Sequence, residues 1–277
     1  MKLLFKNFIF VFAYGLSVLS SYAQNGLAPL PASKNKFVVI AHRGNHVNVP
    51  ENTLASYEEA IKSGADYVEV DLRSSKDGFL VIQHDDTVDR MTDGTGKVNE
   101  KSLDELKKLQ IKNNKPTDAA VHRIPEFREV LKLCKNRINI YLDFKDADVA
   151  ETWKQIQAEG MEKQVVVYLN KIPSYKQWRN IAPQMPLMTS LIEDVKNKDQ
   201  LRFFLGQVKI EALDNIYDQE MVQIAQNEGV GVWLDVQSPS EGPQAWDSAL
   251  QKGVNGVQTD HPEELINYLK KNNWRDG

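Results

Sequence analysis

Short hydrophobic runs alternate with amphipathic stretches from residue 36 to the end of the chain. Nine of these runs are rich in Val, Ile, Leu and Tyr and have the length of a β-strand. They are residues 37–42, 67–72, 79–84, 138–144, 165–169, 187–192, 209–214, 230–235 and 256–259. Stretches with helical spacing, such as residues 53–64 and 261–271, separate most of them. Strands that are hydrophobic throughout and alternate with helices are typical of a parallel sheet covered on both faces.

The link between the second and third runs is too short for a crossover helix. It centres on Lys76-Asp77-Gly78, which is typical of a tight turn, so residues 79–84 are predicted to form a hairpin with residues 67–72. Eight parallel strands then remain. This number favours an α/β fold of the (β/α)8 TIM-barrel type, with a small hairpin and loop insertion after the second strand. An open doubly wound sheet is the alternative.

Residues 91–123 interrupt the alternation with a polar, turn-rich stretch that contains one short helical segment, SLDELKKL. We predict that this stretch is an insertion over one end of the barrel. It either covers a site or is a simple loop. No internal repeat accompanies it.

The first residues have the pattern of a secretory signal. Lys2 and Lys6 precede about a dozen mostly hydrophobic residues, and the small-residue sequence SYA follows. We predict a signal peptide over residues 1–23, a leader segment over residues 24–35 and a single barrel domain over residues 36–277. An exported chain, periplasmic or secreted, is expected, with no stable membrane span after cleavage. An uncleaved membrane anchor is the alternative.

Composition excludes some classes of protein. The chain has 277 residues and a net charge of −4, so nothing favours electrostatic binding of nucleic acid. Cys134 is the single cysteine, which rules out an internal disulfide. It falls on a hydrophobic helical pattern and is predicted to be a buried packing residue.

Polar residues gather where the early hydrophobic runs end. In a parallel barrel these carboxyl ends of strands surround the functional site. The residues concerned are His42, Arg43 and Gly44 after the first run, Glu69 and Asp71 in the second, His84 and Asp85 after the hairpin, and Asp143 and Lys145 in the next. We therefore expect these side chains to meet at one end of the barrel.

Glu69 and Asp71 are two residues apart in a strand, so both side chains project from the same face. Adjacent inward carboxylates repel unless a cation lies between them. With Asp143 as a third oxygen ligand, the set suits one hard divalent cation, Mg²⁺ or Ca²⁺. The alternative is a carboxylate pair satisfied by Lys or Arg.

His42 and His84 are predicted to be the catalytic acid and base, because imidazole titrates near neutrality. Arg43 and Lys145 are predicted to bind the oxygens of a phosphate. The segment from Glu51 to Thr53 is interpreted first as a helix start, capped by Asn52 or Thr53, with Glu51 as an outer hydrogen-bond acceptor.

The three other histidines are not assigned to the site. His261 precedes Pro262 and is expected at a helix start, whereas His46 and His122 are expected in solvated loops.

These residues lie in a series of motifs that resembles the glycerophosphodiester phosphodiesterases. The motifs are AHRG, PENT, VEVDL, KDG, VIQHD and GVNGVQTDHP, in the same order between residues 37 and 270. The resemblance implies a barrel with a hairpin after its second strand, an exported protein and one divalent ion. It also implies the roles given above for the histidines, carboxylates and cations.

Two positions depart from the family pattern. The family usually has Glu-x-Lys where this chain has Asp143-Phe144-Lys145, and Asp is one methylene shorter. The Trp motif, often followed by Thr-x-Asn, is here Trp233-Leu234-Asp235-Val236. Trp233 is predicted to form a hydrophobic wall for the glycerol moiety, and Asp235 adds negative charge near it.

The predicted function is metal-dependent hydrolysis of a small-molecule glycerophosphodiester. The products are an alcohol and sn-glycerol 3-phosphate, or a related phosphomonoester. A phospholipase-type lyase that forms a cyclic phosphate and a catalytically weak phosphodiester-binding barrel are the alternatives. A glycosidase using Asp143 and Asp235 would leave the histidines and cations unexplained.

Overall fold

The computed structural model describes residues 26–115 and 117–276. The predicted signal peptide lies outside these residues. Within them, no helix is both long enough and hydrophobic enough to cross a membrane.

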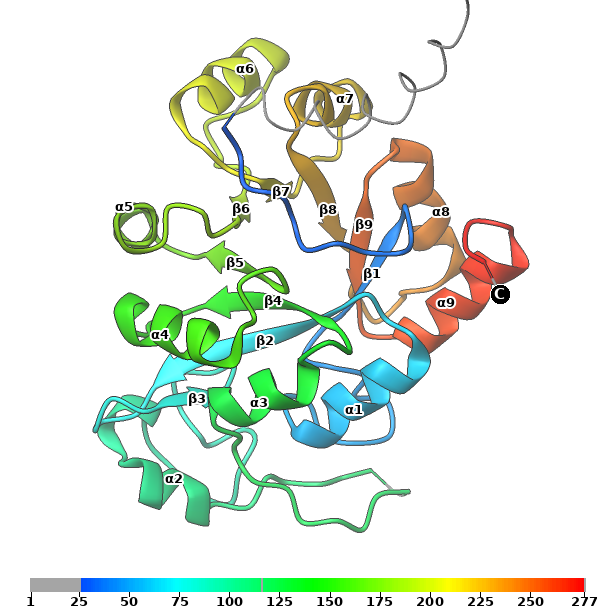
Figure 1. The fold of residues 1–277 in the computed structure, drawn as a ribbon. Helices are drawn as coiled ribbons and strands as arrows, with labels where there is room; N and C mark the ends of the chain where they lie inside the picture. Colours follow the sequence, from blue (N-terminus) through cyan, green and yellow to red (C-terminus); the bar gives the residue numbers. More distant parts are fainter. Residues whose placement is uncertain (1–25, 116, 277) are drawn as a thin grey trace, which may run out of the picture.

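A closed barrel of parallel strands forms the centre of the molecule (Figure 1). The strands are β1 (Val38–Ala41), β2 (Tyr67–Ser74), β3 (Leu80–Ile82), β4 (Asn139–Phe144), β5 (Val165–Leu169), β6 (Leu187–Ser190), β7 (Ala212–Asp214), β8 (Gly231–Asp235) and β9 (Gly256–Thr259). β1 pairs in parallel with both β2 and β9, which closes the sheet. β3 is antiparallel to β2, as predicted. The (β/α)8 barrel is confirmed, and the open sheet was wrong.

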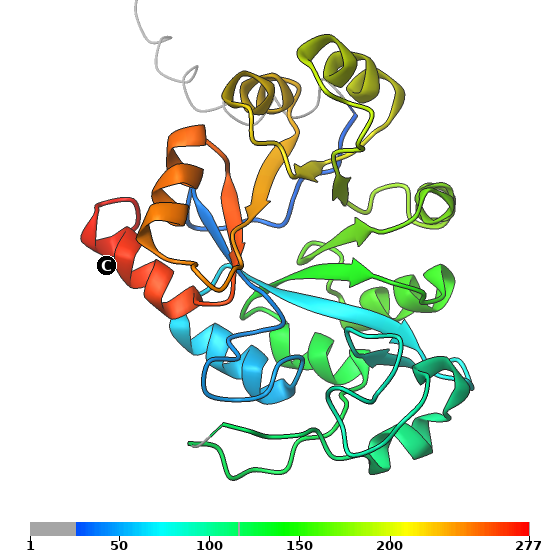
Figure 2. The same ribbon diagram turned by 180° about the vertical axis from the view of Figure 1, so that it is seen from behind.

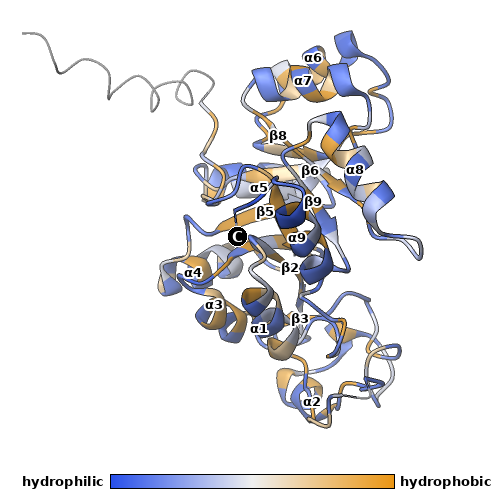
Figure 3. Cartoon of the chain, turned by 90° about the vertical axis from the view of Figure 1, so that its right-hand side faces the viewer, coloured by the Kyte–Doolittle hydropathy of each residue, from blue (hydrophilic) through white to orange (hydrophobic). Residues whose placement is uncertain are grey.

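Helices pack around the barrel, with α2 set apart in the insertion after β3 (Figures 1 and 2). They are α1 (Leu54–Ser63), α2 (Leu103–Lys108), α3 (Phe127–Cys134), α4 (Val149–Glu159), α5 (Ile172–Ile181), α6 (Lys198–Gln207), α7 (Gln219–Asn227), α8 (Pro243–Lys252) and α9 (Pro262–Lys271), with a 3₁₀ turn at Val98–Glu100. Hydrophobic residues concentrate in the strands, and the outer faces of the helices are hydrophilic (Figure 3).

The helix that follows the AHRG motif begins and ends at clear sequence signals. Thr53 is the N-cap of α1, and its hydroxyl accepts from the backbone N–H of Ser56, as one of the two predicted caps. Gly64 ends the helix with a φ of 82°, a left-handed conformation that favours glycine.

The core has two layers. Alternate strand residues point into the barrel, where Val38, Ile40, Tyr67, Tyr141, Val166, Met188, Ala212 and Trp233 pack together. The intervening residues pack against the helices. Cys134 is fully buried in this outer layer, and burial raises the pKa of its thiol to about 12. Its predicted packing role is confirmed.

The predicted leader segment packs against the amino-terminal mouth of the barrel. The Tyr67 hydroxyl donates to the carbonyl of Pro31, and the Ala28 N–H donates to Glu211 Oε1. Leu30 packs against the residues that fill the barrel interior. This part of the segment is therefore integrated with the barrel rather than separate from it.

The insertion between β3 and α3 has a small core of its own. Val81, Val88, Val98, Leu106 and Ile124 are buried together there. Gln83, the first residue after β3, donates its backbone N–H to the carbonyl of Asp71 at 3.0 Å, so the insertion begins beside the region where the polar residues gather.

Candidate active site

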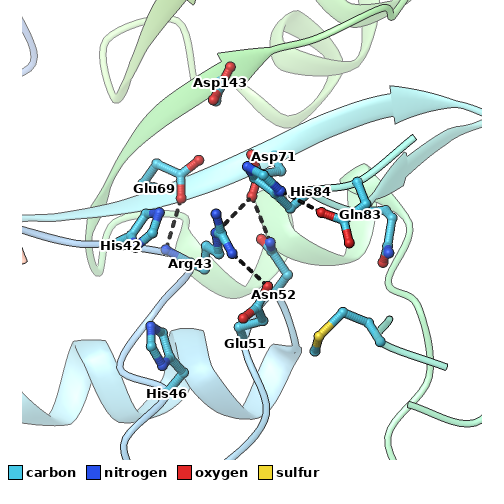
Figure 4. A network of polar contacts seen from close by, with 12 residues as sticks. His42, Arg43, His46, Glu51, Asn52, Glu69, Asp71, Gln83, His84 and Asp143 are labelled. Atoms are coloured by element: carbon cyan, nitrogen blue, oxygen red, sulfur yellow. Dashed lines mark hydrogen bonds and ion pairs between the residues drawn. The ribbon is translucent and has the colours of Figure 1, made fainter. Parts of the chain in front are cut away.

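The carboxyl ends of β1, β2 and β4 and the chain after β3 bring seven of the eight predicted site residues together, and Figure 4 labels all of these except Lys145. They are His42, Arg43, Glu69, Asp71, His84, Asp143 and Lys145. Strand register explains the arrangement of the acids, because Asp71 and Asp143 are directly paired across β2 and β4.

Three carboxylates form a compact cluster at these strand ends. Oxygens of Glu69, Asp71 and Asp143 lie within 4.8 Å of one another. Glu69 and Asp71 are 2% and 0% exposed. Burial, followed by the charges of Asp71 and Asp143, raises the pKa of Glu69 well above its ordinary value. These three carboxylates offer only oxygen ligands and repel one another strongly when ionised, so the cluster is suited to a hard divalent cation.

Two basic side chains flank the cluster. Lys145 Nζ lies 3.1 Å from Asp71 Oδ1 and also contacts Asp143. Arg43 Nη1 lies 2.8 Å from Glu51 Oε1, and its Nε lies 3.6 Å from Asp71 Oδ2. Burial alone would raise the pKa of Asp71, but the positive charges outweigh it and hold that pKa low.

Glu69 is different, because it has no ion pair within the described part of the chain. Its Oε2 accepts only the Arg43 backbone N–H, at 2.8 Å. Lys145 and Arg43 therefore neutralise the charges of Asp71 and Asp143 in part, whereas the charge of Glu69 still calls for a cation.

His42 is held by an acid that was not identified from the sequence. Its Nδ1 lies 2.7 Å from Asp260 Oδ1, which leaves Nε2 as the nitrogen for proton transfer. The same oxygen lies 3.1 Å from His46 Nε2. His46 lies in a loop, as expected, but it is only partly solvated and shares this acid.

Ligand atoms of His42, His46 and Asp260 also lie within 4.8 Å of one another, as in a possible metal group. Both imidazoles point to the same Asp260 oxygen, however. We therefore interpret this trio as a hydrogen-bonded support for His42.

His84 has an equivalent support. Its Nδ1 lies 2.8 Å from Asp85 Oδ1, and Arg90 Nε donates to Asp85 Oδ2 at 2.6 Å. Burial would raise the pKa of Asp85, but hydrogen bonds from Arg90 and His84 lower it to about 2. Arg90 also lies 2.8 Å from Glu51, so the insertion contributes a cation to the edge of the site.

Asn52 positions a carboxylate rather than capping the helix. Its side-chain N–H donates to Asp71 Oδ2 at 2.7 Å, and the Tyr57 hydroxyl donates to its carbonyl oxygen at 2.8 Å. A φ of 54° at Asn52 turns the side chain toward the strand ends. Glu51 accepts from Arg43, in line with the predicted outer acceptor role.

The two remaining histidines lie away from this cluster. His261 is the N-cap residue of α9, as expected. His122 lies in a loop, as expected, but it is not well solvated: its Nε2 lies 2.5 Å from Asp118 Oδ2, and its side chain is 11% exposed.

Trp233 is the predicted site residue that the structure leaves apart from the other seven. It is 3% exposed and lies against Tyr67 and Tyr141, with ring centroids 5.2 and 6.2 Å away. It fills the barrel interior beneath the polar cluster. Two residues further along β8, Asp235 is exposed at the carboxyl mouth.

Fold and site together define a class of protein, the (β/α)8 barrel enzymes. In this one, a carboxylate cluster is suited to a metal ion, two histidines are each hydrogen-bonded to an aspartate, and two basic side chains are suited to binding phosphate. The sequence pattern of the glycerophosphoryl diester phosphodiesterase family matches residues 42–264. The chain belongs to this family.

Individual relatives agree with that assignment. The chain is 31% identical to a glycerophosphodiester phosphodiesterase of Caldanaerobacter subterraneus subsp. tengcongensis, over 85% of this chain and 99% of that protein. One from Bacillus subtilis is 27% identical, over 86% and 88% of the two chains. The solved structure of glycerophosphodiester phosphodiesterase from Agrobacterium tumefaciens has the same fold, with a TM-score of 0.74 at 23% identity over 83% of this chain and 99% of that one.

Removing the Asp260 carboxylate should impair His42 without weakening substrate binding. Asp260→Asn is expected to lower kcat by about 10- to 100-fold with little change in KM, because the imidazole loses its orientation and charge partner. Steady-state kinetics measure this split. Glu264→Gln, an exposed change on α9, is the control and should leave kcat unchanged. A rise in KM alone for Asp260→Asn would contradict the role.

The raised pKa of Glu69 makes it a destabilising group in the metal-free protein. A carboxyl whose pKa is higher in the folded state costs stability as pH rises above its unfolded value, since the folded state resists ionisation. Glu69→Gln should therefore increase the stability of the metal-free protein, by an amount that grows from about pH 4.3 upward. Urea unfolding at several pH values, with EDTA present, measures this difference. Lower stability of Glu69→Gln at pH 7 would contradict it.

Proposed function

We propose that the protein is a phosphoric diester hydrolase that cleaves glycerophosphodiesters to an alcohol and sn-glycerol 3-phosphate or a related phosphomonoester. The observation that carries this proposal is the placement of His42 and His84, each with its own carboxylate, beside the cluster of Glu69, Asp71 and Asp143. Family membership supports the same reaction.

The side chains divide the work of phosphodiester cleavage. The two histidines exchange protons with the nucleophile and the leaving oxygen through Nε2, because Nδ1 of each is bound to an aspartate. Arg43 and Lys145 provide positive charge for the phosphoryl oxygens as negative charge develops there. Glu69, Asp71 and Asp143 would hold a divalent cation, which would supply further stabilisation of that charge.

The donor set favours Mg²⁺ or Ca²⁺ over softer metals, since it contains only carboxylate oxygens. Asp143 has the shorter side chain at the position where the family usually has Glu. Direct register pairing with Asp71 nevertheless brings it into the cluster.

We expect either His42→Ala or His84→Ala to lower kcat by about 10²- to 10⁴-fold, because each removes a proton-transfer group. EDTA should abolish cleavage by the wild type, and added Mg²⁺ or Ca²⁺ should restore it. His122→Ala is the matched control, since His122 lies outside the cluster. The measurement is product release from a panel of glycerophosphodiesters, with phosphorus NMR to detect any cyclic phosphate.

Three results would overturn this reaction. Near-wild-type activity in either histidine variant would remove its proposed role. A cyclic phosphate as the final product would show a lyase, and no cleavage of any diester would show a binding protein.

The protein is also proposed to act outside the cytoplasm, in a periplasm or secreted. Support comes from the signal pattern in residues 1–23. Expression of the full chain in an exporting bacterial host should yield a mature protein that begins at Gln24. Mass spectrometry of the purified protein tests this expectation, and an intact Met1 on all of the exported or membrane-bound protein would contradict it.

A further inference from the structure

The half of the carboxyl mouth formed by β7 and β8 carries two acids that the reaction does not use. Ala212 and Trp233 point into the barrel. Because side chains alternate along a strand, Asp214 and Asp235 point to the same side, one step nearer the mouth. The strand order puts β7 and β8 opposite β2 and β4, so these two carboxylates lie across the mouth from the strand that ends at Lys145.

Asp214 is buried without full compensation. It is 3% exposed, and its Oδ1 has no hydrogen-bond partner. Neither Asp214 nor Asp235 forms an ion pair within residues 26–115 and 117–276, and Asp235 accepts a hydrogen bond from the Gln258 side-chain N–H at 3.1 Å. Burial, then the negative charges of Asp235 and Asp143, raises the pKa of Asp214 to about 7. An unpaired buried carboxylate is costly, so this half of the mouth is suited to a positively charged ligand.

The ligand is better matched by an organic cation than by a metal ion. Neither acid belongs to a group of three ligand atoms close enough to hold a metal in the described chain. Aromatic side chains accompany them instead. Tyr217 is 56% exposed, and the charges that raise the pKa of its hydroxyl after burial are those of Asp235 and Asp214. Carboxylates beside aromatic rings are a common environment for ammonium groups.

The two halves of the mouth therefore have opposite character. Arg43 and Lys145 lie on the β1–β4 half and suit the phosphate anion. Asp214 and Asp235 lie on the β7–β8 half, where neither forms an ion pair with another described residue, and burial raises the pKa of Asp235 although the charge of His42 opposes this. A substrate with a phosphodiester at one end and an ammonium group at the other would complement both.

We infer that the preferred substrates are glycerophosphodiesters whose alcohol carries a positive charge, such as an ethanolamine or choline head group, with Asp214 and Asp235 contacting the ammonium. This inference rests on the proposed hydrolysis and specifies its substrate class. Diesters of neutral alcohols, such as glycerol or inositol, would lack this contact.

The experiment compares kcat/KM of the holoenzyme for four diesters: glycerophosphocholine, glycerophosphoethanolamine, glycerophosphoglycerol and glycerophosphoinositol. The wild type should prefer the two cationic substrates by about tenfold. Asp235→Asn should remove most of that preference and leave cleavage of the neutral substrates unchanged within about twofold. Glu193→Gln removes one negative charge from the exposed loop after β6 and should keep the preference.

Asp214→Asn tests whether the buried acid contributes to the preference for cationic substrates, and circular dichroism confirms that this variant folds. Asp235 is exposed, so Asp235→Asn tests the same preference without a risk to folding. Choline alone should inhibit the wild type competitively and Asp235→Asn more weakly. Equal cleavage of all four diesters by the wild type would overturn the inference while leaving the hydrolase intact. Equal changes in the substrate preference of Asp235→Asn and Glu193→Gln would also overturn it. So would an equal loss of kcat/KM for neutral and cationic substrates in Asp235→Asn, which would indicate that Asp235 contacts the glycerol hydroxyls. No cleavage of any diester would overturn the proposed function itself, and the inference with it.

Discussion

The buried carboxylate of Asp71 is the contact on which the arrangement of the site depends. It is fully buried on β2, accepts a hydrogen bond from Asn52 and lies close to both Arg43 and Lys145. These partners come from the loop after β1 and from the end of β4. A buried charge must be surrounded by such partners, so Asp71 draws three separate segments to one point. The positions of Arg43 and Lys145, the side chains suited to phosphate, follow from their contact with Asp71.

Each of the two catalytic histidines is held by an aspartate, but the two aspartates have different partners of their own. Each imidazole uses Nδ1 to bind an aspartate, which fixes the ring and leaves Nε2 free for proton transfer. Asp85 is itself paired with Arg90 from the insertion, whereas Asp260 is shared with His46. The insertion after β3 therefore contributes a positive charge to the site and also forms a small core of its own.

Strand periodicity made much of the fold and site predictable from the sequence. Hydrophobic runs separated by helices indicated the barrel, and the two-residue spacing of Glu69 and Asp71 indicated a shared inward face. Asp260 was missed because it lies more than two hundred residues from its partner His42, a contact that no local spacing reports. The TDHP motif was the available signal, since its Asp follows a strand just as His42 does. Trp233 was placed at the mouth because its motif does not show how far it lies from the end of β8: it points inward like Asp235 but lies two residues earlier, in the barrel interior.

The hydrophobic barrel interior explains why the mouth needs cations of two kinds. Tyr67, Tyr141 and Trp233 fill the space beneath the strand ends, so the acids above them have little solvent on their inner side. Burial is the largest influence that raises the pKa of Glu69, Asp143 and Asp214 alike. On the β2–β4 side the acids are close enough together to share one small ion. Asp214 and Asp235, on the β7–β8 side, belong to no such group of three ligands in the described chain, so a charged group of the substrate can satisfy them, and the same physical cost of burial then supports both catalysis and selectivity.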